Sequence, residues 1–302
     1  MPDSSPQGDD MLVTGETRGL GVSCYAAVNG VQLHYREAGQ GPLVVLLHGF
    51  PQFWYAWKDV IPALADAGYR VVAPDLRGYN LSGKPAGVEA YTIDTLADDV
   101  AALIQHTGER RAHVVGHDWG GAIAWHLAMR HRALVDHLVV INGPHPRAFR
   151  RELRTFGQLR RSRYAFFFQL PRLPEAALAR GDFAAVRRIF REEPMRPDAF
   201  TEEDIDRYVA ALARPWALTS ALNYYRASFR YRPAHPPSFS SRIDAPTMLI
   251  WGERDRHLGN RMSEGIDEWV PNLTVERLPD VSHWVMADAP ADVERLLGRF
   301  LP

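Results

Sequence analysis

Five short apolar runs constrain the fold of this chain more than any other feature of its sequence. Runs of this kind are typical of strands that are buried on both faces of a parallel sheet. They lie at residues 43–47, 70–76, 113–116, 138–142 and 247–252. Helical patterns separate or follow them, at residues 54–67, 93–107, 119–131 and 290–300. This alternation predicts an α/β fold with a mostly parallel, doubly wound sheet.

The alternation is interrupted once, in the segment from residue 145 to residue 237. This segment has helical patterns and no apolar β-type run, and the proline-rich stretch YRPAHPP closes it. It is also rich in arginine, for which binding of an acidic surface is one interpretation; we favour solvated helix faces whose arginine stems cover apolar surface. We therefore predict an all-helical cap at 145–237, inserted into a core made of residues 21–144 and 238–302.

The beginning of the chain predicts a tail followed by a hairpin. Residues 1–20 are mostly polar, and we expect them to form a flexible tail. Residues 22–37 are interpreted as two strands joined by Asn29-Gly30, a strong hairpin signal. The first residues, MPDSSPQGDD, lack the basic start and apolar run of a secretory signal.

Composition narrows the class of protein. The net charge of −1 gives no reason to expect a nucleic acid or an anionic membrane as partner. The single cysteine, Cys24, excludes an intramolecular disulfide and a cysteine metal site. No apolar stretch approaches the roughly 18 residues that a membrane span needs. We expect a soluble, cytoplasmic protein whose partner is a small molecule.

The hexapeptide GHDWGG at residues 116–121 has the spacing of a nucleophile elbow, the tight turn that joins a strand to a helix in many hydrolases. Gly116 and Gly120 leave out side chains where strand and helix crowd together. The centre of the motif, where a serine is usual, is Asp118. A helix N-cap is the alternative role for an aspartate at this point, and the hexapeptide alone leaves both roles open.

Three further segments favour the catalytic role. Phe50 follows the strand 43–47, and in an oxyanion hole one backbone N–H comes from this loop and one from the residue after the nucleophile, here Trp119. Asp255 stands at the end of the strand 247–252, and His283 lies in a loop after the predicted strand VERL. The chain order of nucleophile, acid and histidine is that of α/β-hydrolases.

Together these motifs resemble the epoxide hydrolase branch of the α/β-hydrolase fold family, which is close to the haloalkane dehalogenases. The matching stretches are HGFPQFWYAW, PDLRGYNLS, GHDWGG, NGPHP, WGERD and SHW. The similarity runs from about residue 25 to about residue 300. It implies an α/β-hydrolase fold whose helical cap is inserted after the strand that ends at NGPHP. It also implies addition of water to an epoxide to give a vicinal diol, with no metal or organic cofactor.

An aspartate nucleophile suits this chemistry. A carboxylate is ionised at neutral pH, with a reference pKa of about 3.9, and can displace a leaving group from a saturated carbon to form an alkyl ester. His283, oriented by Asp255, would then take a proton from the water that attacks the ester of Asp118. The N–H groups of Phe50 and Trp119 would hold the oxyanion that results.

Opening an epoxide expels a strongly basic alkoxide, and a tyrosine can supply its proton. The stretches YAFFFQLP and LNYYRAS resemble those that carry the two cap tyrosines of the family, which points to Tyr164 and Tyr225. Tyr224, the neighbour of Tyr225, would point about 100° away on a helix. Packing of an amphipathic helix is the alternative role for both tyrosines.

Aromatic residues are predicted to line the substrate pocket and to favour an apolar epoxide. The candidates are Phe50, Trp119, Phe166, Phe167, Phe168 and Trp284. A haloalkane dehalogenase with the same triad is the first alternative, with Trp119 and Trp216 as possible indole donors to a halide. Against it, Phe50 stands where one group of dehalogenases has an asparagine. A non-catalytic small-molecule binding protein is the second alternative.

Overall fold

The computed structural model describes residues 19–233 and 242–302. The predicted tail at residues 1–20 therefore lies, except for its last two residues, outside the described part of the chain. The same holds for residues 234–241, where the predicted cap ends and the second part of the core begins.

The core is an eight-stranded sheet with the order β1-β2-β4-β3-β5-β6-β7-β8. The two strands of the predicted hairpin, β1 and β2, pair antiparallel, and β2 also pairs antiparallel with β4. All remaining neighbours are parallel. The strands are β1 (Val22–Val28), β2 (Val31–Ala38), β3 (Leu43–Leu47), β4 (Arg70–Pro74), β5 (Ala112–His117), β6 (Val135–Ile141), β7 (Thr247–Gly252) and β8 (Leu273–Leu278).

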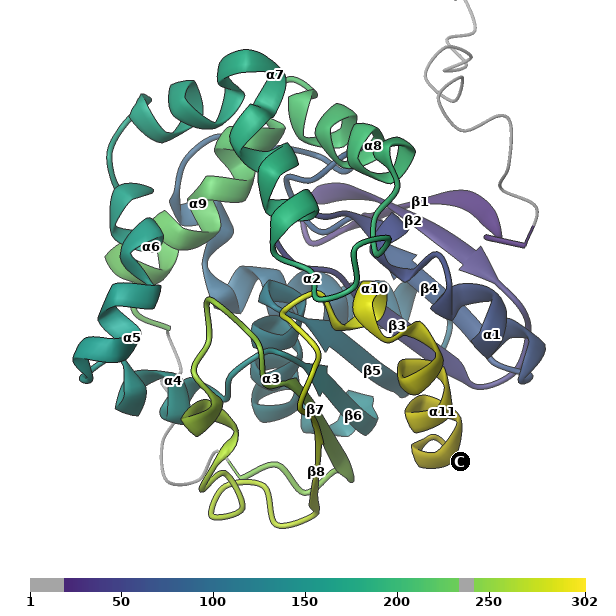
Figure 1. The fold of residues 1–302 in the computed structure, drawn as a ribbon. Helices are drawn as coiled ribbons and strands as arrows, with labels where there is room; N and C mark the ends of the chain where they lie inside the picture. The colour runs from purple at the N-terminus through teal and green to yellow at the C-terminus, as the bar shows by residue number, and fades with distance from the viewer. Residues whose placement is uncertain (1–18, 234–241) are drawn as a thin grey trace, which may run out of the picture.

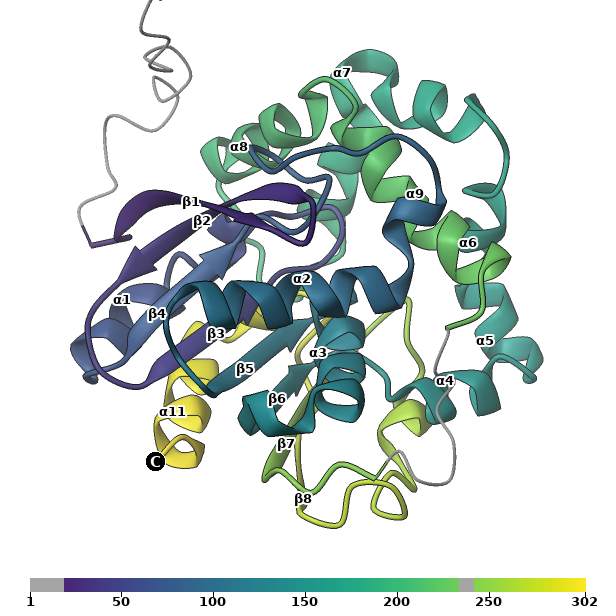
Figure 2. The same ribbon diagram turned by 180° about the vertical axis from the view of Figure 1, so that it is seen from behind.

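The apolar runs are buried because helices cover both faces of the sheet. Every residue of β3, β5 and β7 is buried. Figures 1 and 2 show α1 and α11 on one face and α2 and α3 on the other. The core helices are α1 (Val60–Asp66), α2 (Ile93–His106), α3 (Trp119–Arg130), α10 (Val285–Asp288) and α11 (Pro290–Phe300). The predicted doubly wound, mostly parallel sheet is confirmed.

One predicted helix is shorter than expected. The pattern at residues 54–67 suggested one helix, but the structure has a 3-10 turn, η2 (Trp54–Trp57), followed by α1 from Val60. Pro62 explains the difference. In a helix begun at Trp54 its ring would clash with the carbonyl group of Lys58, whereas in α1 it occupies the first turn, where a proline is tolerated.

Between β6 and β7 the described residues form helices and no strand (Figure 1). The helices are α4 (Pro146–Glu152), α5 (Phe156–Arg161), α6 (Arg163–Phe167), α7 (Leu173–Glu192), α8 (Glu202–Ala213) and α9 (Ala217–Arg230). The predicted fold with an inserted helical cap is thus confirmed. None of the helices in the described ranges is both long and apolar enough to cross a bilayer.

Aromatic rings join the cap to the core. Phe190 of α7 stacks on Tyr208 of α8, with ring centroids 4.7 Å apart. The same Phe190 ring lies 5.1 Å from Trp284, which belongs to the core loop before α10. Because all three rings are buried, this contact excludes water at one side of the interface between cap and core.

Close backbone contact fixes the start of α3 against the end of β3. A Cβ atom on Gly120 would lie 2.0 Å from the carbonyl oxygen of Leu47. No side chain fits there, so residue 120 must be glycine for α3 to begin directly above the sheet.

We predict that Gly120→Ala lowers the free energy of unfolding by at least about 2 kcal/mol, because the methyl group forces α3 away from β3. Gly298→Ala is the matched control: a Cβ atom there meets nothing within 4 Å. In the exposed last turn of α11 this change should raise stability by up to about 1 kcal/mol. Urea denaturation measures both. Equal effects of the two substitutions would contradict the close contact.

Candidate active site

Asp118 occupies the turn between β5 and α3 in an unusual backbone conformation. Its φ is 52° and its ψ is −116°. Few residues other than glycine adopt a positive φ, and such strain costs on the order of 1–3 kcal/mol. The side chain forms no capping hydrogen bond with α3. Instead its Oδ1 accepts a hydrogen bond of 2.8 Å from the backbone N–H of Phe50, in the loop after β3. The simple N-cap role is therefore not what the structure shows.

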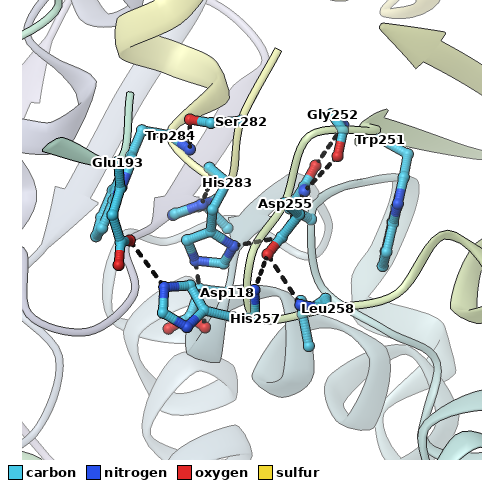
Figure 3. A network of polar contacts seen from close by, with 12 residues as sticks. Asp118, Glu193, Trp251, Gly252, Asp255, His257, Leu258, Ser282, His283 and Trp284 are labelled. Carbon is cyan, nitrogen blue, oxygen red and sulfur yellow. Dashed lines mark hydrogen bonds and ion pairs between the residues drawn. The ribbon is translucent and has the colours of Figure 1, made fainter. Parts of the chain in front are cut away.

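His283 lies between two carboxylates (Figure 3). Its Nδ1 donates a hydrogen bond of 2.6 Å to Oδ2 of Asp255. Its Nε2 is 3.7 Å from Oδ2 of Asp118. His283 comes from the loop between β8 and α10, Asp255 follows β7, and Asp118 follows β5. The three residues meet because parallel strands all end at the same edge of the sheet.

Asp255 is held by three donors besides the histidine. Its Oδ1 accepts hydrogen bonds from the backbone N–H groups of His257 and Leu258, at 2.7 and 2.9 Å. Its Oδ2 accepts one of 2.7 Å from the side-chain amide of Asn142, at the end of β6. The amide oxygen of Asn142 in turn accepts from the N–H of Gly252. Sequence reasoning did not assign a role to Asn142, although it is the first residue of the NGPHP stretch.

These contacts set the charges of the site. Burial opposes a charge on His283, but Asp255 and Asp118 outweigh burial and raise its pKa to about 9. Burial raises the pKa of Asp118, while His283 and the N–H groups of Phe50 and Trp119 act in the opposite direction. Burial also acts to raise the pKa of Asp255, but His283 more than offsets it and the net shift is downward. At neutral pH His283 is therefore a cation beside the ionised Asp255.

Tyr164 of α6 and Tyr225 of α9 contact each other edge to face. Their ring centroids are 5.8 Å apart. The Tyr225 ring also lies 5.0 Å from Trp119 and 5.6 Å from Phe50. Burial raises the pKa of both phenols, and the negative charge of Asp118 raises it further. Both hydroxyl groups therefore keep their protons at neutral pH and can donate hydrogen bonds.

Tyr224 is directed away from this group, as its place on the helix predicts. Its hydroxyl group donates a hydrogen bond of 2.7 Å to the backbone oxygen of Arg77 in the core. It is fully buried and contacts the rings of Tyr79 and Tyr91. Tyr224 thus connects cap and core, and it does not line the cavity that contains Asp118.

A cavity of about 770 Å³ lies between cap and core. Asp118, His283, Tyr164 and Tyr225 line it, together with several aromatic and aliphatic side chains. Four of these were among the predicted pocket residues: Phe50, Phe167, Phe168 and Trp284.

Two predicted pocket residues do not line the cavity. Phe166 is 46% exposed, and its ring packs against Phe229 on the outside of the cap. Three consecutive phenylalanines cannot all face inward on a helix, because successive side chains are about 100° apart. The ring of Trp119 packs against Tyr225 and is not among the lining residues.

An ion pair that sequence reasoning missed borders the same cavity. Nε2 of His257 is 2.8 Å from Oε2 of Glu193, at the end of α7 (Figure 3). The His257 ring lies 5.5 Å from the His283 ring and 5.4 Å from the Tyr164 ring. Glu193 and His257 are far apart in the sequence and on different parts of the fold, so no local pattern signals their contact.

Comparisons with known proteins agree with this architecture. A family described as the alpha/beta hydrolase fold matches residues 42–290. The AB hydrolase superfamily protein YfhM of Bacillus subtilis is 43% identical over 285 residues, which is 93% of this chain and 98% of that protein. Epoxide hydrolase 4 of Mus musculus is 38% identical over 294 residues, 93% of this chain and 80% of the mouse protein.

Solved structures of epoxide hydrolases are similar to this chain in fold. A crystal structure of an epoxide hydrolase from Bacillus megaterium has a TM-score of 0.84 and 36% identity, and the match covers 92% of this chain and 99% of that one. An epoxide hydrolase from Vigna radiata has a TM-score of 0.81 and 27% identity, with 95% and 99% covered.

We predict that the pKa of His283 is lower in Asp118→Asn than in the unmodified protein, because one of the two negative charges beside the ring is removed. In the unmodified protein the positive charge of His283 persists at neutral pH and is lost as the pH rises through about 9. NMR titration of the histidine ring protons measures both values. His126, whose partner is Asp94, is the internal control and should titrate alike in both proteins. An unchanged His283 titration would contradict the coupling to Asp118.

Proposed function

The chain belongs to the α/β-hydrolase fold family, in a branch whose similar members are named epoxide hydrolases, and from this premise we propose that it hydrolyses epoxides to vicinal diols. The observation that carries the proposal is the pairing of a carboxylate at the elbow with two phenols across one apolar cavity. A carboxylate attacks a saturated carbon, and phenols protonate the alkoxide that leaves.

In the proposed first step, Oδ2 of Asp118 attacks an epoxide carbon and the ring C–O bond breaks. Oδ1 is engaged by the N–H of Phe50, so Oδ2 is the oxygen left free toward the cavity. Tyr164 or Tyr225 donates its proton to the new alkoxide as it forms. The products of this step are an alkyl ester on Asp118 and a tyrosinate, whose high pKa favours recovery of a proton from the His283 cation.

In the proposed second step, neutral His283 acts as a base. Esterification has removed the charge of Asp118, one of the causes that raise the pKa of His283, so the pKa falls and the neutral form is easier to reach at this stage. His283 takes a proton from water, and the hydroxide adds to the ester carbonyl. The N–H groups of Phe50 and Trp119 stabilise the oxyanion. The tetrahedral intermediate expels the diol oxygen, which takes the proton back from His283, and Asp118 then returns its own proton to the imidazole.

The dehalogenase alternative has less support. A halide needs converging N–H donors, and Trp216, one of the two candidates, is 74% exposed. Trp216 is not among the residues that line the cavity, whereas both tyrosines are. The proposed substrate is a predominantly apolar epoxide, in keeping with the phenylalanine-rich lining.

We predict that His283→Gln accumulates the Asp118 ester, because water can no longer be activated for the second step. Intact-protein mass spectrometry after mixing with styrene oxide or phenyl glycidyl ether should show a mass gain equal to the whole epoxide. Adding Asp118→Asn should abolish the gain. A gain equal to an alkyl group after mixing with 1-bromobutane would instead favour a dehalogenase. Absence of any adduct in the folded variant would count against both enzymes and favour a binding protein.

We predict that Tyr225→Phe and Tyr164→Phe each lower kcat/KM for an epoxide by about 10- to 100-fold, and that the double variant loses more than about 1000-fold, since each phenol can partly replace the other as acid. Tyr224→Phe is the matched control. It removes a buried hydrogen bond worth about 1 kcal/mol of stability and leaves kcat/KM essentially unchanged. Equal losses in all three single variants would show that the tyrosines act only through packing.

A further inference from the structure

Arginine side chains surround the opening of the active-site cavity. Four arginines are among its lining residues: Arg160 and Arg161 at the end of α5, Arg163 at the start of α6, and Arg256 in the loop after β7. All four are exposed. Residues that are both exposed and part of the lining mark the place where the cavity meets solvent, whereas Tyr225 and His283 lie at its buried end.

Within the described residues the positive charge at this opening is only partly balanced, since Arg256 alone of the four acts on a neighbouring carboxylate, that of Glu193. Within residues 19–233 and 242–302, no carboxylate lies within ion-pair distance of any of these four side chains. The one acidic residue of the lining besides Asp118 is Glu193, and its carboxylate is engaged by His257. Arg161 donates a hydrogen bond of 2.8 Å to the backbone oxygen of Asp255, which leaves its charge uncompensated.

Several other arginines of the cap are paired with carboxylates. Arg187 contacts Asp182 and Asp206, Arg191 contacts Glu202, and Arg226 contacts Glu175. Other exposed arginines of the cap, such as Arg150, Arg154 and Arg188, also have no ion pair within the described residues. The four at the opening differ from these in that they border one cavity together.

We propose that the substrate carries an anionic group at the end remote from the epoxide. This inference rests on the proposed function and specifies its substrate class. The apolar lining accepts the body of the molecule, Asp118 attacks the epoxide at the buried end, and the guanidinium groups at the opening bind a carboxylate or another anion. A guanidinium group suits this purpose, because it presents several N–H donors in one plane and is always charged.

The arginines would affect how fast an anionic substrate enters the cavity as well as how tightly it binds. A cluster of like charges around a concave opening raises the local concentration of oppositely charged substrate and speeds its association. This contribution weakens with salt, because the Debye length falls from about 30 Å at 0.01 M to about 8 Å at 0.15 M ionic strength. Preference for an anionic substrate should therefore be greatest at low ionic strength.

The test compares three forms of phenyl glycidyl ether whose para substituent is negative, neutral or positive: a carboxylate, hydrogen and a trimethylammonium group. At low ionic strength kcat/KM should be highest for the carboxylate and lowest for the cation, with about tenfold between carboxylate and hydrogen. The triple variant Arg160→Gln, Arg163→Gln, Arg256→Gln should lose this preference through a higher KM for the carboxylate, so that kcat/KM falls more for the carboxylate than for the neutral epoxide.

The matched control removes the same charge elsewhere in the cap. Arg150, Arg154 and Arg188 are exposed and do not line the cavity, so their triple change to Gln should leave the preference intact. If the neutral epoxide is hydrolysed and the three substrates have equal kcat/KM, the substrate inference is overturned and the proposed function stands.

If none of the three epoxides is hydrolysed, the proposed function fails. The inference of an anionic ligand is then tested by binding alone. Isothermal titration calorimetry then compares the carboxylate diol with the neutral diol. Tighter binding of the carboxylate diol, lost in the cavity triple variant alone, supports recognition of an anion at the opening. Equal binding of the two diols overturns it.

Discussion

One buried imidazole between two carboxylates determines how the rest of this site is arranged. His283 is hydrogen-bonded to Asp255 at 2.6 Å and stands 3.7 Å from Asp118. The closer carboxylate fixes the orientation of the ring, and the farther one is the nucleophile of the proposed reaction. Asn142 and the loop after β7 hold Asp255, and the strained elbow holds Asp118. Each of these features supports the same three-residue geometry.

The sheet and the grouping of Asp118, Asp255 and His283 could be predicted from sequence because their signals are local. A buried strand is recognised by its own apolar run, and residues that follow parallel strands meet at one edge whatever the details of packing. The contacts that the sequence did not reveal join distant segments. Glu193 meets His257 across the boundary of cap and core, and nothing near either residue indicates the other. The error at Phe166 arose from helix geometry, since α6 turns that ring to the outside.

Cap and core contribute different kinds of residue to the cavity. Asp118, His283 and the N–H of Phe50 come from the core, where buried strands hold them rigidly. The two phenols, most of the apolar lining and three of the four arginines come from the cap. The core thus holds the residues of the proposed reaction at fixed distances. The cap holds the residues that would contact the rest of a ligand, and these can change without moving the core residues.

The insertion of the cap between β6 and β7 also orders events while the chain is being made. The elbow with Asp118 is synthesised before the cap, and β7 and β8, with the loops that carry Asp255 and His283, come last. Until those strands emerge, β6 has an open parallel edge and Asp118 lacks both the imidazole and the acid beside it. A ribosome-bound chain that stops after α9 therefore carries the carboxylate and both phenols but no base. Under the proposed mechanism such an intermediate would have no means of hydrolysing an ester on Asp118, so completion of the sheet would also complete the candidate site.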